Sequence, residues 1–133
     1  MNIEWVIPCR FVEVHDNLAT IVGGGIDTLW VPELPAPLQI VLCVRLTGMP
    51  EELTEDQQHK AVNRVRDPSG TVISEMSGEF AIGVESTRPD WLVGISLPTA
   101  IQFEAPEEGT YTIDHMVDDA EYSIPMHVAL GQP

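Results

Sequence analysis

Glu107-Glu108-Gly109-Thr110-Tyr111 is the stretch that decides the predicted fold. It runs into alternating residues from Thr112 to Val117, then a hairpin turn, then a last alternating run to Leu130. An acidic residue, a glycine and a tyrosine at this spacing, ahead of a period-2 strand, are typical of the tyrosine corner in an immunoglobulin-like sandwich. We expect the Tyr111 hydroxyl to bond to backbone near Ala105 to Glu108. The pattern predicts architecture and says nothing of activity.

The cleanest strand pattern lies between Leu38 and Thr47, where aliphatic residues fill every even position. Its other face is only partly polar, which predicts a central strand whose back is covered by a neighbour or by a partner subunit. No stretch of ten or more residues carries a helical apolar stripe, and turn signals separate eight or nine strand patterns. The sequence therefore predicts an all-β, immunoglobulin-like or fibronectin-like antiparallel β-sandwich of about 8–9 strands, with residues 1–133 as one domain.

Five residues are assigned structural roles at or beside turns. Asp67-Pro68-Ser69-Gly70 separates the strand patterns His59–Arg66 and Thr71–Met76 and has the chemistry of a type I turn. Gly109 opens the tyrosine-corner strand. The predicted structural residues are therefore Asp67, Pro68, Gly70, Gly109 and Tyr111.

Prolines and side-chain parity predict where other strands end. The odd-numbered residues from Ile3 to Phe11, Trp5 included, alternate with the even-numbered ones, which predicts one half-buried strand with Ile3 and Trp5 on the same face. Pro8 favours an edge position for it. Pro98 is expected to end or kink the strand that begins near Trp91. Arg64 and its basic neighbours can pair across strands with Glu75 or Glu79, or can form a binding face.

Composition narrows the classes of partner. The chain has 21 acidic and 6 basic residues, a net charge of −15, which repels nucleic acids and anionic membranes. We therefore expect neither as a partner; a basic partner or divalent cations fit this charge, as does selection for solubility alone. There is no apolar run long enough to span a bilayer and no signal peptide, so a cytoplasmic location is expected. Cys9 and Cys43 are expected to be buried thiols, with a cross-sheet disulfide as the alternative.

Catalytic motifs are missing from the sequence. There is no His-x-His, His-Glu-x-x-His or Cys-x-x-Cys spacing for a metal, and no Gly-x-Ser-x-Gly elbow. We therefore predict no catalytic residues, no metal, no cofactor and no enzymatic activity. His115 stands out because strand parity places it on the inner face beside Tyr111. It is either a buried histidine bonded to backbone or to Tyr122, or a ligand-binding or basic group.

Aromatic and acidic side chains supply the remaining candidates for a binding site. Trp30 or Trp91 could stack on a sugar ring, and Asp118 and Asp119 crowd one hairpin where carboxylate oxygens could hold calcium. A solvated turn is the alternative for the two aspartates. The predicted ligand-binding residues are Trp30, Trp91, His115, Asp118 and Asp119.

Five short motifs, spread over nearly the whole chain, carry a family resemblance: Trp5-x-x-x-Cys9, Asn17-Leu18-x-x-Ile21-x-Gly23, Pro32-x-Leu34-Pro35, Asp67-Pro68-x-Gly70 and Gly109-x-Tyr111. Together they resemble a family of short, uncharacterised bacterial single-domain β-sandwich proteins. That family has no assigned activity, so the resemblance implies a fold and leaves function open.

Two functions follow as expectations. The first is a non-catalytic module that binds a protein partner or its own copy through a sheet edge or face. The alternative is binding of a small ligand or carbohydrate, with or without calcium, through acidic loops and an exposed tryptophan. The second idea fails if all three tryptophans are buried.

Overall fold

The computed structural model describes residues 1–132, which form an all-β structure with no α-helix. Ten strands are present, against the eight or nine expected, because the chain bends at Arg10 and begins a separate hairpin. The elements are β1 (Asn2–Cys9), β2 (Phe11–His15), β3 (Leu18–Val22), β4 (Thr28–Val31), β5 (Ala36–Gly48), the 3-10 turn η1 (Pro50–Glu52), β6 (His59–Arg66), β7 (Val72–Phe80), β8 (Val93–Ala105), β9 (Gly109–Val117) and β10 (Ala120–Leu130).

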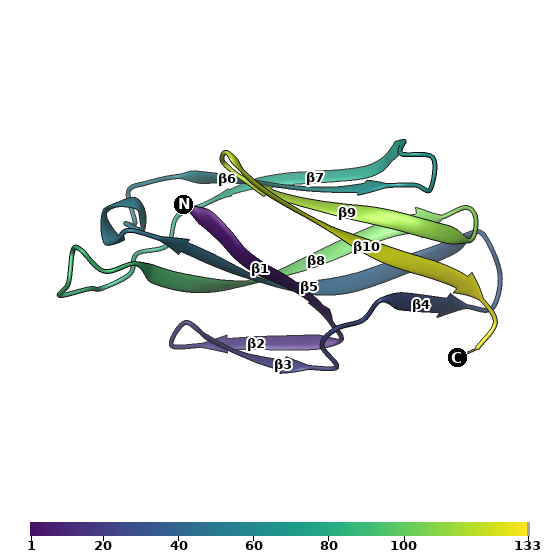
Figure 1. Ribbon diagram of the computed structural model, residues 1–133, viewed down its shortest axis with the longest axis horizontal. Helices are drawn as coiled ribbons and strands as arrows, with labels where there is room; N and C mark the ends of the chain where they lie inside the picture. Colours follow the sequence, from purple (N-terminus) through teal and green to yellow (C-terminus); the bar gives the residue numbers. More distant parts are fainter. Residues whose placement is uncertain (133) are drawn as a thin grey trace.

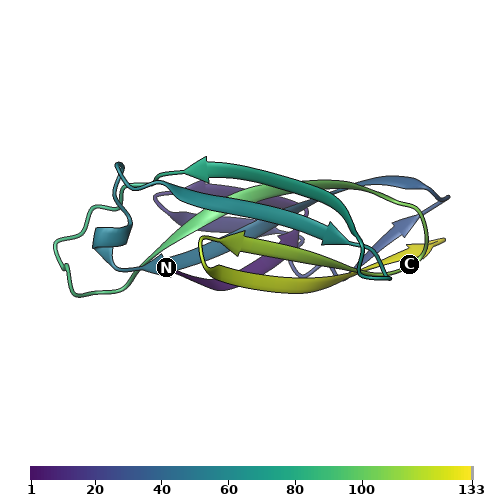
Figure 2. The same ribbon diagram turned by 90° about the horizontal axis from the view of Figure 1, so that it is seen from above.

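The strands form three sheets arranged as layers (Figure 1). A five-stranded sheet has the order β4-β10-β9-β6-β7, a three-stranded sheet has the order β1-β5-β8, and β2 and β3 form a hairpin. The view in Figure 2 looks onto the five-stranded sheet, with the purple hairpin on the far side of the molecule. All pairings are antiparallel except that of β4 with β10, which is parallel.

The hydrophobic core lies between the two larger sheets. The even-numbered residues of β5 from Leu38 to Leu46 face inward, as their alternation predicts. Opposite them stand the inward residues of β9, and the rings of Phe103 and Tyr111 meet with their centroids 5.6 Å apart. Burial of one apolar face from each sheet is the main stabilising contribution.

The hairpin β2–β3 covers the back of the three-stranded sheet. The side chain of Asn17, at the hairpin turn, accepts a hydrogen bond from the Ser96 N–H (2.9 Å) and donates one to the Gly94 carbonyl. Cys9 and Cys43 are both free thiols and both buried. The partly apolar back of β5 is therefore covered by a hairpin of the same chain.

Two strand predictions differ from the structure. A bulge between Ile3 and Trp5 reverses the parity of β1, so that Ile3 packs toward the core whereas Trp5 pairs with the outward Arg45. Pro98 lies inside β8, which runs unbroken for 13 residues. An edge strand tolerates proline because the missing N–H can face away from the neighbouring strand. Pro8 is likewise on an edge strand, as its ring predicts.

The turn residues singled out in the sequence come together at one end. The Tyr111 hydroxyl donates to the Glu107 carbonyl at 2.7 Å and accepts from the Glu107 N–H at 3.3 Å, which is the bonding of a tyrosine corner. Gly109 has φ 143° and lies against Pro68, so a Cβ there would come within 2.6 Å of the proline Cγ. Asp67 Oδ1 accepts bonds from the N–H groups of Ser69 and Thr71. The turn 67–70 therefore packs on the start of β9.

Candidate binding surfaces

The two candidate tryptophans are exposed but far apart. Trp30 on β4 is 45% exposed, and Trp91 in the loop before β8 is 58% exposed. That loop and β4 lie at opposite ends of the molecule (Figure 1). The Arg88 guanidinium stacks on Trp91, 4.9 Å from the ring centroid. The two rings therefore cannot form one stacking platform, and only one of them can belong to a given ligand site.

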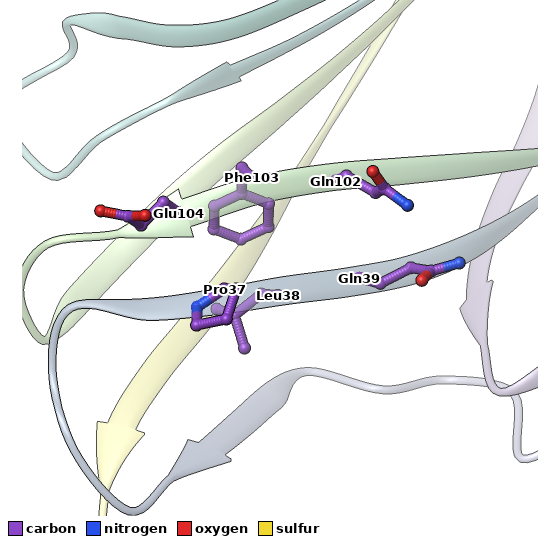
Figure 3. A pocket seen from close by; sticks show the side chains of 6 residues that line it. All are labelled: Pro37, Leu38, Gln39, Gln102, Phe103 and Glu104. Carbon is purple, nitrogen blue, oxygen red and sulfur yellow. The ribbon is translucent and has the colours of Figure 1, made fainter.

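Trp30 stands beside a hollow of about 620 Å³, whose polar lining comes from Arg10, Thr28 and Gln39. Gln39 also borders a second hollow of about 470 Å³ along the paired strands β5 and β8. Figure 3 shows the Gln39 and Gln102 side chains reaching out from these neighbouring strands, with Phe103 and Glu104 further along β8. An exposed indole next to amide, hydroxyl and guanidinium groups is thus present at this end of the molecule.

Asp118 and Asp119 lie in the β9–β10 turn, away from Trp30. Asp118 Oδ1 accepts a hydrogen bond from the Lys60 N–H at 3.0 Å, and its Oδ2 lies 2.7 Å from Nδ1 of His59. The other ring nitrogen of His59 donates to the Glu52 carbonyl at 2.8 Å. This histidine–carboxylate pair is therefore engaged at both ends and fastens the start of β6. Within residues 1–132, no three His, Cys, Asp or Glu side chains are grouped to hold a metal ion.

A buried carboxylate, Asp114, organises the outer face of the five-stranded sheet. Arg66 donates to both of its oxygens, at 2.8 and 2.9 Å, and the Ser123 hydroxyl adds a bond of 2.6 Å. The Arg66 guanidinium lowers the pKa of Asp114, with help from Ser123 and Arg64. Arg64 lies opposite Glu75 in register, but it forms its ion pair with Asp114 instead. Arg64 and Arg66 therefore stabilise the pairing of β6 with β9 through their ion pairs with Asp114.

The strand β7 ends the five-stranded sheet and has a free edge. The Lys60 carbonyl accepts from the Asp118 N–H, so even-numbered residues of β6 bond to β9 and odd-numbered ones to β7. Residues of β7 that pair with odd-numbered positions, such as Met76 and Gly78, therefore bond to β6. The backbone groups that point away from the sheet are those of Glu75, Ser77 and Glu79.

The edge of β8 is blocked at several points, unlike that of β7. The Asn17 side chain is hydrogen-bonded to the Gly94 carbonyl and the Ser96 N–H. The Ser74 hydroxyl donates to the Gln102 carbonyl at 3.1 Å. Pro98 has no N–H. Of the two edges that face each other across the open side of the molecule, that of β7 is the one available for pairing.

A cleft of about 320 Å³ lies between β7 and β8 and reaches inward to His115. His115 is 2% exposed, and burial lowers its pKa to about 4. Its Nδ1 is hydrogen-bonded to Oδ1 of Asn63, the neighbour across the strand pair, and not to Tyr122 or to backbone. Its Nε2 has no hydrogen-bond partner among residues 1–132. Sequence parity indicated that His115 faces inward, but the Asn63 contact depends on strand register and could not be predicted.

The strands and sites described above define an all-β protein with antiparallel sheets, a tyrosine corner and a free sheet edge. Residues 4–129 match a family of unknown function, DUF6941, and the chain belongs to that family. A comparison with curated proteins gives no match. Among the described residues, no helix has the length and apolar character needed to cross a membrane.

Proposed function

We propose that this protein is a non-catalytic interaction module that binds an extended, basic segment of another protein along the free edge of β7. The observation that carries the proposal is the outward backbone of Glu75, Ser77 and Glu79, which no strand of residues 1–132 pairs with. An extended segment adds to such an edge through main-chain hydrogen bonds, and its alternate side chains supply specificity.

Charge favours a basic partner over a second copy of the chain. Glu75 and Glu79 are exposed on the edge strand, and the whole chain carries a net charge of −15. Two copies brought together at this edge would repel each other, whereas lysines or arginines in a partner would be attracted. Acidic residues on an edge strand also prevent it from pairing with the edges of other acidic chains. This is consistent with a site that binds basic partners alone.

The test is a titration of the 15N-labelled protein with a nine-residue peptide of alternating valine and lysine. We expect amide shifts centred on β7 and slowed exchange of the Glu75, Ser77 and Glu79 N–H groups. Binding should weaken as salt is raised, because the attraction between exposed charges is screened. A peptide with glutamate in place of lysine should not bind.

Ser77→Pro removes one outward N–H and leaves the ladder with β6 intact, so it should abolish binding without unfolding the protein. Ser77→Ala keeps the N–H and is the matched control. Equal binding by the two variants would rule out edge pairing, and so would shifts that map away from β7. Light scattering completes the test, since a stable dimer in low salt would favour self-association over a separate partner.

A second candidate function is carbohydrate binding at Trp30, favoured by the exposed indole beside a hollow lined with Arg10, Thr28 and Gln39. Sugar rings stack on such indoles while amide and hydroxyl groups bond to their hydroxyls. Titration with a panel of neutral oligosaccharides, followed by tryptophan fluorescence, tests it. Trp30→Ala should lose any response that Trp91→Ala retains; if both variants respond alike, the site is not at Trp30.

We infer that the architecture is immunoglobulin-like. Sheet β1-β5-β8 faces sheet β7-β6-β9-β10-β4, and the tyrosine corner opens β9 as it opens strand F of immunoglobulin domains. On this reading β5 and β8 correspond to strands B and E, and β6, β9 and β10 to C, F and G. β7, the strand after β6 (strand C), pairs with β6 and does not cross to β8 (strand E). This pairing supports a free edge on each sheet. A single domain over residues 1–133 and a cytoplasmic location complete the proposal.

A further inference from the structure

The cleft between β7 and β8 is a second feature, separate from the outward backbone of β7. Its walls are largely apolar and include Met76 and Phe80 from β7 and Leu97 from β8. Its polar groups include Asn63 and His115. A volume of about 320 Å³ with apolar walls and a few converging polar groups is typical of sites for small molecules.

Asn63 and His115 together leave one hydrogen-bond donor and one acceptor unused. The imidazole is neutral at ordinary pH, because burial disfavours its charged form. If Nδ1 donates to Oδ1 of Asn63, then Nε2 is a free acceptor and the Asn63 NH2 group is a free donor. If the amide is turned the other way, Nε2–H is the free donor and the Asn63 oxygen the free acceptor. Either arrangement offers one of each.

A hydroxyl group both donates and accepts, so it matches this pair in either arrangement. A carboxylate can only accept and an ammonium can only donate, and each would lose its hydration in the cleft. We propose that the β7–β8 cleft binds a small, neutral, apolar molecule that carries a hydroxyl, a phenol or an alcohol, with the hydroxyl held between Asn63 and His115.

The experiment compares p-cresol, toluene and 4-methylbenzoate by NMR titration of the protein, with the His115 ring nitrogens observed directly. We expect p-cresol to bind about tenfold more tightly than toluene, the discrimination of a well-formed hydrogen bond, and to shift His115 Nε2. 4-Methylbenzoate should bind more weakly than either. Equal affinity for p-cresol and toluene, shifts that map elsewhere, or no binding of any probe would overturn the proposal.

Two variants localise the effect. A Cβ at Gly78 would meet no atom within 4 Å, so this cleft residue accepts a side chain, and Gly78→Phe should block the cleft and abolish binding of p-cresol and toluene. Glu75→Phe, on the same strand but outside the lining of the cleft, is the matched control and should leave binding unchanged. His115→Phe should keep toluene binding and lose the preference for p-cresol. Retention of that preference in His115→Phe would refute the assigned role of the histidine.

Glu75→Pro separates this proposal from edge binding. It removes an outward backbone donor of β7 at a residue that does not line the cleft, so peptide binding should be lost while p-cresol should still bind. Loss of p-cresol binding together with peptide binding in this variant would show that the cleft and the edge are one site, contrary to the proposal.

Discussion

Asn17 Oδ1 accepts a hydrogen bond from the backbone N–H of Ser96 at 2.9 Å, although 79 positions separate the two residues. The same amide donates to the Gly94 carbonyl, so one side chain takes the place of a peptide group on the edge of β8. This contact fastens the β2–β3 hairpin over the back of β5.

Asn17→Ala should therefore loosen the hairpin and cost about 1–3 kcal/mol, because two backbone groups of β8 lose their partners. The specific readout is thiol labelling, since Cys43 is buried beneath the hairpin and should react faster in the variant. Asp16→Ala, at the neighbouring turn position, is the control. Unchanged labelling in Asn17→Ala would mean that the apolar contacts of the hairpin suffice to hold it.

Tyr111→Phe should lower the free energy of unfolding by about 1 kcal/mol, the net contribution of a typical hydrogen bond. The variant removes a hydroxyl that bonds to both backbone groups of Glu107 while it leaves the buried ring in place. Urea denaturation measures the change. Binding of the basic peptide should be unaffected, because Tyr111 is buried in the core; a larger loss of binding than of stability would contradict a structural role.

His115 predicts a pH dependence of stability. Its folded pKa of about 4 lies below the value of 6.5 for an unperturbed histidine, so the unfolded state binds more protons between these values. The histidine's contribution is fully present above about pH 6.5 and is lost as the pH falls toward 4. The loss over this window is about 2–3 kcal/mol by linkage. His115→Gln should flatten this part of the stability curve; an unchanged slope would assign it to other groups.

Asp114→Asn should destabilise the protein by about 2 kcal/mol, because the amide keeps one acceptor oxygen for the two Arg66 donors and leaves the guanidinium charge without its counter-ion. The lowered pKa of Asp114 means that its contribution is present above the unfolded pKa of about 4 and is lost as the pH falls further. Denaturation at pH 7 and at pH 3 should therefore separate wild type from variant at the higher pH and bring them closer at the lower one. Ser123→Ala, which removes one neutral donor, should cost less.

Gly109→Ala tests the packing of the turn 67–70 on β9. The new methyl group would lie 2.6 Å from Pro68 Cγ, at a φ of 143° that residues with a Cβ rarely adopt. We expect a loss of at least about 1 kcal/mol, measured by thermal or urea unfolding. Adding Pro68→Ala should recover part of the loss by removing the clash. If the single variant is as stable as wild type, the backbone at Gly109 is not constrained as described.

Local patterns predicted much of the fold. The alternation of Leu38 to Leu46 correctly marked the core face of β5, and the spacing of Gly109 and Tyr111 led to the hydroxyl bonds with Glu107. The parity of Trp5 was wrong because a bulge after Ile3 depends on pairing with β5. Pro98 gave a false strand end because its edge position was unknown. Pro8 correctly indicated an edge strand, but because a proline can also end a strand, local chemistry did not decide between these two roles for Pro98.

The binding surfaces were less accessible to sequence reasoning than the core. The sequence could indicate that Trp30 and Trp91 are exposed. It could not indicate that they lie at opposite ends of the molecule, because their positions depend on the order of the strands in the sheets. Contacts such as Asn63 with His115, or Arg66 with Asp114, join residues about 50 positions apart through strand register. Glu75 and Glu79 are nearer in the sequence and were the predicted partners of Arg64 and its basic neighbours. In the structure the arginines pair with the buried carboxylate of Asp114 on β9.

The ion pairs of Arg45, Arg64 and Arg66 have a consequence for the behaviour of the protein in bulk solution. Three of the six basic side chains lie in ion pairs with Glu4 or Asp114, so the remaining surface carries its negative charge with little local compensation. Colloidal repulsion, rather than a covering loop, then keeps the bare edge of β7 from meeting that of another molecule. High salt screens this repulsion and acid neutralises the carboxylates, so concentrated solutions of the protein should precipitate first under these conditions. Replacing Glu75 and Glu79 should make the protein precipitate at lower salt or at higher pH.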